Sequence, residues 1–318
     1  MNSVIAEGRL AEARFAACDP TQTIADFVRG FSVEATRPTA EETAVLAALV
    51  PKGTRVYVSA VPTRPIQEAL EGAIRLKAAG LNPVPHVAAR QFASAAALDR
   101  FLAQLTQEAG VERILIIAGD RDRPAGDYRS ALEVIDGGLL QRRGINEIGI
   151  AGYPEGHPRI PQQDLDRALM DKIAAAEATG IKVHIVTQFC FDAAAILQWI
   201  RRLRDFGVEH PVRVGLAGPT SLPALLRYAR RCGVRASIEG LARQSGLARQ
   251  LFAMTTPDTL VQALAQARSE RHLGAVKPHF FAFGGVAATA RWAAAVAERR
   301  ITLAAGPGFR VEPAARMR

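Results

Sequence analysis

The chain alternates short apolar runs with longer amphipathic stretches, and this alternation constrains its fold more than any other feature. The runs are rich in Val, Ile and Leu without polar alternation, which is typical of parallel strands buried on both faces. The runs predicted as strands are Phe31–Glu34, Arg55–Val61, Pro83–Ala89, Arg113–Asp120, Glu147–Tyr153, Lys182–Phe189, Pro211–Ala217 and His279–Phe283. Glycines such as Gly80 and Gly180 precede several runs, where a helix would hand over to a strand.

The stretches between the runs carry Ala, Leu and Arg at helical spacing. They predict helices over Glu41–Leu49, Pro65–Ala79, Ser94–Ala109, Tyr128–Gln141, Pro161–Thr179, Ala193–Phe206, Leu222–Cys232 and Ala287–Arg299. Repeated strand–helix units joined by right-handed crossovers close naturally into a barrel. We therefore predict an α/β fold, a single (β/α)8 TIM barrel. A doubly wound open sheet is the alternative, but it usually needs fewer strands.

Three regions depart from the regular alternation. The interval between the seventh and eighth strands has room for two extra helices, over Ala236–Phe252 and Pro257–Arg271. Residues 1–30 form a predicted N-terminal helical extension, in which Ile24–Arg29 closes the bottom of the barrel. The catalytic barrel is expected over residues 31–303, followed by a loosely ordered C-terminal tail over residues 304–318.

The net charge of +9 raises the question of an anionic partner. The basic residues are scattered as Arg pairs, such as Arg142–Arg143 and Arg299–Arg300, mostly where helices end and oppose the helix dipole. No basic run is interleaved with aromatic residues, which make up 6% of the chain. We therefore expect no nucleic-acid partner, and a small anionic substrate explains the excess charge better.

The chain shows no targeting signal, and its cysteines are few and scattered, so we predict a cytoplasmic protein. No stretch approaches the roughly 20 apolar residues that cross a bilayer, and Met1–Ala17 has no apolar signal core. Cys18, Cys190 and Cys232 are far apart without a CxxC, which fits a reducing compartment. We expect a cytoplasmic protein without a membrane partner, and leave open whether it forms a homo-oligomer.

The sequence lacks the motifs of several common classes of enzyme and nucleotide-binding protein. The sequence has no GxGxxG after a strand, no GxxxxGK[ST] and no GxSxG. Its six histidines include no HExxH and no pair at i, i+4, so we expect no metal site. A nicotinamide would therefore bind on the barrel itself, through loops at the carboxyl ends of the strands.

Polar side chains stand where the apolar strands end. They are Glu34, Ser59, His86, Asp120, Tyr153 with His157, and Gln188. Because the carboxyl ends of parallel strands share one rim, the set predicts a site there. A carboxylate in such a place is costly to bury unless it is paired or neutralised. Each residue alone could be a strand-end or helix cap, so the set is more informative than any member.

Two segments in this set resemble the methylenetetrahydrofolate reductase family. Thr187–Asp192 reads TQFCFD, like the family's TQFFFD-type segment, and Ala151–Pro158 reads AGYPEGHP, like its YPE-x-HP segment. Weaker matches, in family order, are Phe31–Glu34, Val58–Ser59, Gly119–Asp120 and His279–Phe281. The resemblance spans nearly the whole predicted barrel.

The resemblance implies a flavoprotein that moves a hydride between NADH or NADPH and a tetrahydrofolate derivative. It converts 5,10-methylenetetrahydrofolate to 5-methyltetrahydrofolate, or runs in reverse in methyl-group catabolism. By resemblance, Glu34 is the general acid at the folate N10, Asp120 balances charge beside the flavin, and Gln188 binds the pterin or nicotinamide. The implied FAD-binding residues are Ser59, His86, Asp120, Tyr128, Tyr153, His157, Asp164 and Lys172. A partly desolvated Glu suits the acid role, because burial raises the pKa of a carboxyl group.

The chain also departs from the family pattern. Ala118 stands where the family has an Arg, Asp166–Lys172 is less basic than the family's helix, and Ala282–Gly285 lacks the family's TLNR. By the resemblance, the family's residues on that helix usually hold the FAD pyrophosphate and ribose. A flavin-free variant with direct hydride transfer stays open, as does a pterin- or corrinoid-linked methyl-transfer barrel without redox chemistry. A yellow chromophore in the purified protein would exclude the second.

Overall fold

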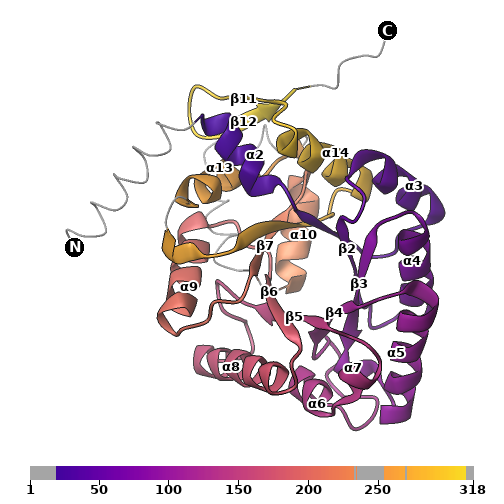
Figure 1. The fold of residues 1–318 in the computed structure, drawn as a ribbon. Helices are drawn as coiled ribbons and strands as arrows, with labels where there is room; N and C mark the ends of the chain where they lie inside the picture. The colour runs from indigo at the N-terminus through magenta and orange to yellow at the C-terminus, as the bar shows by residue number, and fades with distance from the viewer. Residues whose placement is uncertain (1–18, 233, 235–253, 269–270, 313–318) are drawn as a thin grey trace. The chain divides into compact units, whose positions relative to one another are not determined.

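The computed structural model describes residues 19–232, 234, 254–268 and 271–312 (Figure 1). Eight parallel strands form a closed barrel in the order β1-β10-β7-β6-β5-β4-β3-β2. They are β1 (Ser32–Ala35), β2 (Arg55–Val58), β3 (Asn82–Ala88), β4 (Arg113–Ile117), β5 (Glu147–Gly152), β6 (Lys182–Thr187), β7 (Val212–Ala217) and β10 (Val276–Phe281). Each lies within a residue or a few residues of its predicted range, and the predicted (β/α)8 barrel is confirmed.

The chain divides into two compact units. One comprises residues 32–188 and 210–213, and the other comprises the described residues of 19–31, 189–209 and 214–312. All the residues predicted for the site belong to the first unit, which we call the site unit. It contains β1 to β6 and the first residues of β7.

The strand register of the site unit decides which side chains share a face. Glu34 of β1 is the register partner of Tyr57 on β2, and Tyr57 is the partner of Val84 on β3. Tyr57 and Val84 pack with Leu115 and Val186 in one buried cluster. Because side chains alternate along a strand, residues two positions away point to the same face as these.

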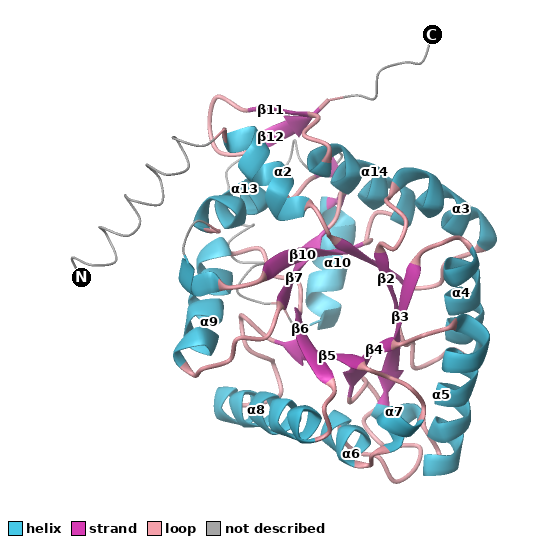
Figure 2. Cartoon of the chain, in the orientation of Figure 1, coloured by secondary structure: helices cyan, strands magenta, loops and turns pink. Residues whose placement is uncertain are grey.

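Helices cover the outside of the site unit's strands (Figure 2). They are α3 (Ala40–Leu49), α4 (Gln67–Ala78), α5 (Ala95–Ala109), α6 (Ala131–Asp136), α7 (Leu139–Arg142) and α8 (Gln162–Ala178), with a short 3₁₀ turn, η1 (Ala89–Gln91). Local sequence explains their ends. Thr39 and Glu42 form a reciprocal capping box at the start of α3, and α5 runs from the cap Ser94 to Gly110, which is left-handed.

One predicted helix is wrong as a continuous element. The predicted helix over Tyr128–Gln141 is two short helices, α6 and α7, and Tyr128 lies in the loop before them. The Ser130 side chain accepts from the Glu133 amide and so starts α6 at residue 131. Gly138, with φ 65°, breaks the helix before α7.

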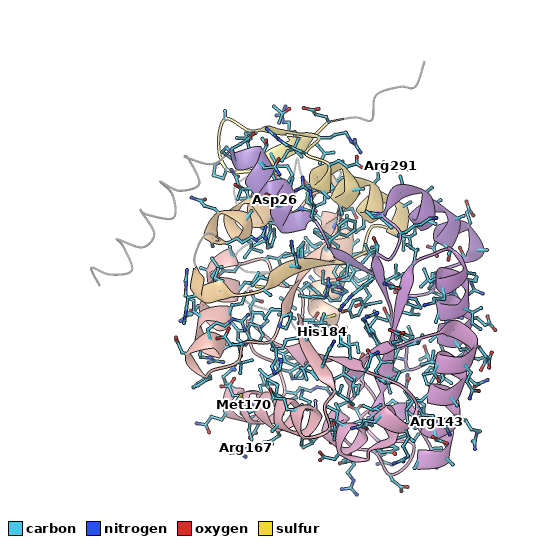
Figure 3. The ribbon with its side chains drawn as sticks, viewed as in Figure 1. Asp26, Arg143, Arg167, Met170, His184 and Arg291 are labelled. Atoms are coloured by element: carbon cyan, nitrogen blue, oxygen red, sulfur yellow. The ribbon has the colours of Figure 1, made fainter. Side chains whose placement is uncertain are left out.

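Side chains on these elements separate into an outer and an inner set (Figure 3). Arg143, Arg167 and Met170 lie on the outer helical layer, where Arg143 binds Asp99 of α5. His184 of β6 is 2% exposed and lies inside the curve of the strands. The barrel interior of this unit is therefore partly polar.

The second unit holds the remaining elements. They are α2 (Pro20–Val28), α9 (Ala193–Asp205), β8 (Thr220–Ser221), α10 (Leu222–Cys232), β9 (Met254–Thr255), α13 (Asp258–Ala267), η2 (Arg271–Leu273), α14 (Val286–Ala297), β11 (Ile301–Leu303) and β12 (Phe309–Val311). Of the two extra helices, the second is α13, while Ala236–Phe252 lies outside the described residues. β11 and β12 pair antiparallel, so the predicted loose tail over residues 304–318 contains an ordered strand, β12. No described helix is long and apolar enough to cross a membrane.

Candidate active site

Three predicted residues meet at one point of the site unit: Glu34, Ser59 and His86. The Ser59 amide donates to the Ala35 carbonyl at 3.2 Å, which carries the β1–β2 ladder one residue past β2. The Ser59 hydroxyl donates to Glu34 Oε1 at 2.6 Å. His86 Nε2 lies 3.6 Å from Glu34 Oε2. The side chains of His86 and Glu34 are only 9% and 15% exposed.

The two carboxylate oxygens of Glu34 have different neighbours. Oε1 accepts from a hydroxyl, whereas Oε2 faces an imidazole nitrogen. A largely desolvated carboxyl group beside an imidazole can hold a proton and release it. The cluster is therefore suited to general acid–base chemistry.

The loop after β4 carries Asp120, which is exposed, and Tyr128, which is half-buried. Gly119 turns the chain with φ 91°, and a Cβ on it would lie 3.0 Å from that of Ala88. Arg90 anchors the loop: its Nε donates to the Arg129 carbonyl at 2.8 Å and its Nη1 to the Arg121 carbonyl at 3.2 Å.

The loop after β5 places two aromatic rings beside Asp120. Tyr153 and His157 make an edge-to-face contact with centroids 5.3 Å apart. Burial raises the pKa of Tyr153, and the charge of Asp120 raises it further. Burial and Arg159 lower the pKa of His157, while Asp120 opposes that shift. The Arg159 amide donates to His157 Nδ1 at 3.2 Å, so a neutral ring carries its hydrogen on Nε2.

Gln188 ends β6 within the same unit. Its amide donates to the Gly152 carbonyl at 2.9 Å, which ties the end of β6 to the end of β5. Its side chain is half-buried. The ends of β5 and β6 therefore lie side by side, with Gln188 at the end of β6.

Two predicted residues stand apart on α8. Asp164 is exposed in the first turn and lies 3.8 Å from Arg167. Lys172 lies about three turns into the helix. Burial lowers the pKa of Lys172 to about 8. Within the described residues, neither makes a hydrogen bond or ion pair to another predicted site residue.

Sequence reasoning missed Arg90 and Tyr57. Arg90 follows an apolar strand, where an arginine is usually expected to be solvated. The sequence therefore gives no indication that its side chain binds two carbonyl groups. Tyr57 reads as a core aromatic in an apolar run. Its signal was the spacing of polar side chains two apart at Arg55, Tyr57 and Ser59, the last one residue past β2, which puts all three on one face of the extended chain.

The second unit gathers aromatic residues from both remaining family-like segments. Phe189 and Phe191 belong to the TQFCFD segment, and Phe281 belongs to the HFF segment. Phe189 contacts both other rings edge-to-face, with centroids 5.6 Å apart in each case. Phe283 lies 4.9 Å from Phe189 and stacks on Tyr228 at 4.1 Å. The segment's Asp192 instead caps α9.

The sequence of this chain matches a known protein family. The sequence model of the family described as methylenetetrahydrofolate reductase matches residues 59–243. Methylenetetrahydrofolate reductase 2 of Saccharomyces cerevisiae is 28% identical over 132 residues, 38% of this chain and 21% of that protein. The 5,10-methylenetetrahydrofolate reductase of Pectobacterium carotovorum is 30% identical over 158 residues, 49% of this chain and 50% of that protein. The chain thus matches between about a fifth and a half of the length of these relatives.

A solved structure supports the fold. An uncharacterized protein from Clostridium thermocellum, described as binding two copies of 5-methyl-5,6,7,8-tetrahydrofolic acid, has a TM-score of 0.55 with 13% identity. The match covers 87% of this chain and 96% of that one. Residues 59–243 are more than half of this chain's 318 residues, and the chain belongs to the methylenetetrahydrofolate reductase family as a divergent member.

Proposed function

We propose that this chain is an oxidoreductase that moves a hydride between NADH or NADPH and a folate-bound one-carbon unit through FAD. The reaction would interconvert 5,10-methylenetetrahydrofolate and 5-methyltetrahydrofolate. The family match supports the reaction class. The observation that carries the proposal is the buried Glu34 carboxyl, held by Ser59 on one oxygen and facing His86 with the other.

Ring opening of the methylene bridge needs a proton on the folate amine, and Glu34 would deliver it. Because the Ser59 hydroxyl donates to Oε1, that oxygen acts as an acceptor and the transferable proton sits on Oε2. Low exposure keeps water from competing for this proton. Asp120 would offset positive charge that develops on the one-carbon unit, since it already acts on Tyr153 and His157.

The residues around Asp120 fit a flavin dinucleotide. The flavin, when bound, supplies the hydride chemistry. Tyr153 and His157 offer a ring pair, and Arg121, Arg123 and Arg159 bring positive charge to the adjoining loops. On α8, the half-buried Lys172 ammonium has no hydrogen-bond or ion-pair partner within the described part of the chain, so a phosphate would offset its partial desolvation. These groups would replace the basic helix residues that the sequence lacks.

Glu34→Gln tests the proposal, because it keeps the side chain's shape and removes the transferable proton. Flavin reduction by NADH or NADPH needs no folate protonation and should stay near the wild-type rate. Folate turnover should fall roughly 10²–10⁴-fold, the usual range for general acid catalysis. The two half-reactions are measured separately by stopped flow, with a melting curve for each protein.

Glu177→Gln is the matched control, since Glu177 is a surface carboxylate that pairs with His210. It should leave both half-reactions unchanged. Equal slowing of both half-reactions in Glu34→Gln, with a lower melting temperature, would make Glu34 a structural carboxylate. A purified protein with no flavin absorbance would favour direct hydride transfer or the methyl-transfer alternative.

A further inference from the structure

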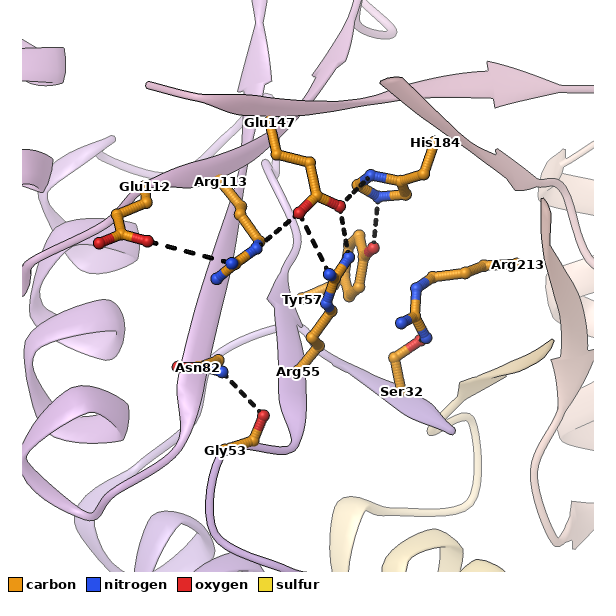
Figure 4. A network of polar contacts seen from close by, with 10 residues as sticks. All are labelled: Ser32, Gly53, Arg55, Tyr57, Asn82, Glu112, Arg113, Glu147, His184 and Arg213. Atoms are coloured by element: carbon orange, nitrogen blue, oxygen red, sulfur yellow. Dashed lines mark hydrogen bonds and ion pairs between the residues drawn. The ribbon is translucent and has the colours of Figure 1, made fainter. Parts of the chain in front are cut away.

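A chain of buried and half-buried polar contacts lies at the opposite end of the site unit's strands (Figure 4). Tyr57 Oη lies 2.7 Å from His184 Nε2, and His184 Nδ1 lies 2.9 Å from Glu147 Oε1. Arg55 binds both carboxylate oxygens of Glu147, at 2.6 and 3.1 Å. Arg113 Nε donates to Oε2 at 2.7 Å. Tyr57 and His184 are 0% and 2% exposed.

The chemistry of the partners fixes the direction of these contacts. Two guanidinium groups hold Glu147 as a carboxylate, which can only accept hydrogen bonds. The hydrogen of a neutral His184 ring therefore lies on Nδ1, facing Glu147. His184 Nε2 is then an acceptor, so the Tyr57 hydroxyl donates to it. The Tyr57–His184 hydrogen bond and the two arginines on Glu147 hold the ends of this chain, and His184 Nδ1 contacts Glu147 between them.

Such a network is unusual in this place, because barrel interiors are normally filled by branched apolar side chains. Buried charges are costly, so the network is no simple source of stability. The network also depends on the missing side chain of Gly149. A Cβ there would lie 2.8 Å from His184 Nε2 and 2.9 Å from Leu115 Cδ1. A side chain at this position would push the His184 ring away from Tyr57.

Tyr57 links this network to the candidate active site. It is the register partner of Glu34, and Ser59, which donates to Glu34, follows two residues later on the same strand face. The Tyr57 ring meets His86 edge-to-face, with centroids 6.2 Å apart and an interplanar angle of 77°. It meets His184 in the same way at 6.2 Å and 80°.

We propose that Tyr57 is a positioning residue for the acid–base cluster. The His184–Glu147–Arg55 contacts fix its ring, and the ring sets the orientation in which His86 faces Glu34. The consequence for catalysis rests on the proposed function, whereas the effect on His86 is a property of the fold alone. Tyr57 itself touches no substrate in this proposal.

Tyr57→Phe tests it, because the ring stays and only the hydroxyl that holds it is lost. At one fixed pH, the ring ¹⁵N resonances of His86, assigned by their absence in His86→Gln, should shift. The kcat for folate turnover should fall on the order of tenfold, as supporting contacts around a site typically contribute, with little change in KM. Gly149→Ala, which displaces His184 instead, should shift the His86 resonances as well.

Leu105→Ala is the control for stability, since Leu105 is buried in α5 on the outside of the barrel. It should lower the melting temperature without moving the His86 resonances or kcat. Unmoved His86 resonances in both Tyr57→Phe and Gly149→Ala would overturn the proposal and leave the network purely structural. A wild-type protein that turns over no folate would instead reject the proposed reaction, while the His86 resonances would still decide the role of Tyr57.

Discussion

Asp120 is an exposed carboxylate whose charge acts on two half-buried rings, so its electrostatic role can be measured at the level of single residues. Its charge adds to the raised pKa of Tyr153 and partly offsets the lowering of the His157 pKa by burial and Arg159. Asp120→Asn should therefore lower both pKa values while leaving the protein folded. Folate turnover should slow on the order of 10²-fold, the loss expected for one preorganised electrostatic partner. NMR titration of His157 and steady-state kinetics measure the two effects.

Asp127→Asn provides the matched control in the same loop. Burial raises the pKa of Tyr128, and Asp127 raises it further, but Asp127 does not act on His157. This variant should lower the Tyr128 pKa and leave the His157 titration as in the wild type. An unchanged His157 titration in Asp120→Asn would mean that Asp120 is only a loop carboxylate.

The site residues were predictable from sequence where a simple geometric rule applied. Polar residues at the ends of parallel strands share a rim, and the rule placed Glu34, Ser59 and His86 together. It could not say that Ser59 and His86 face Glu34, because that depends on strand register. Tyr57 was not predicted because the sequence of an apolar run does not show whether the hydroxyl of a tyrosine in it makes a hydrogen bond.

At the scale of elements, the loop between β4 and α6 is docked on η1 by backbone contacts that leave no room for a side chain. The Ala125 amide donates to the Arg90 carbonyl at 2.9 Å. A Cβ on Gly126 would lie 2.2 Å from the Ala93 carbonyl oxygen. Gly126→Ala should therefore cost about 1–3 kcal/mol by overpacking, or release the loop that carries Asp120. Urea unfolding and hydrogen exchange of residues 118–130 measure the two outcomes.

Gly306→Ala is the matched substitution, because a Cβ there meets nothing within 4 Å. It should leave both measurements close to the wild type. Equal behaviour of the two variants would mean that the loop is not held against η1.

The predicted bounds were right for elements with a clear hydrophobic period. They were wrong where one residue ends an element. All eight barrel strands were predicted because buried parallel strands form apolar runs. The helix over Tyr128–Gln141 was wrong because its apolar spacing continues through Gly138, whose left-handed backbone breaks it. β12 was missed because a strand of three residues, Phe309–Val311, is too short to show a period.

At the scale of the whole molecule, the buried network makes folding sensitive to acid. Burial lowers the pKa of His184 below the usual 6.5, and Glu147 only partly offsets this. Burial alone would raise the pKa of Glu147, but the bonds from His184 and Arg55 outweigh it and hold the pKa far below the usual 4.5. In both cases the unfolded chain binds the proton more readily than the folded one. Stability therefore falls as the pH falls.

Each group acts in its own pH window. His184 contributes stability that is complete above about pH 6.5 and is lost as the pH falls toward its folded pKa. Glu147 contributes stability that is complete above about pH 4.5 and is lost below that. One group changes the free energy of unfolding by at most about 1.4 kcal/mol per pH unit. The wild-type protein should lose stability first through His184 and then through Glu147.

Urea unfolding at a series of pH values between 7.5 and 3.5, on the order of one unit apart, measures this slope for each protein. His184→Gln has no imidazole to titrate, so its slope between pH 6.5 and 4.5 should be shallower than that of the wild type. Below that range the slope should persist, because Glu147 still binds Arg55 and Arg113. His272→Gln, at an exposed histidine paired with Asp205, is the matched substitution measured in the same series. If His184→Gln and the wild type share one slope, the imidazole is not held neutral by burial, and its Nε2 would donate to the Tyr57 hydroxyl instead of accepting from it.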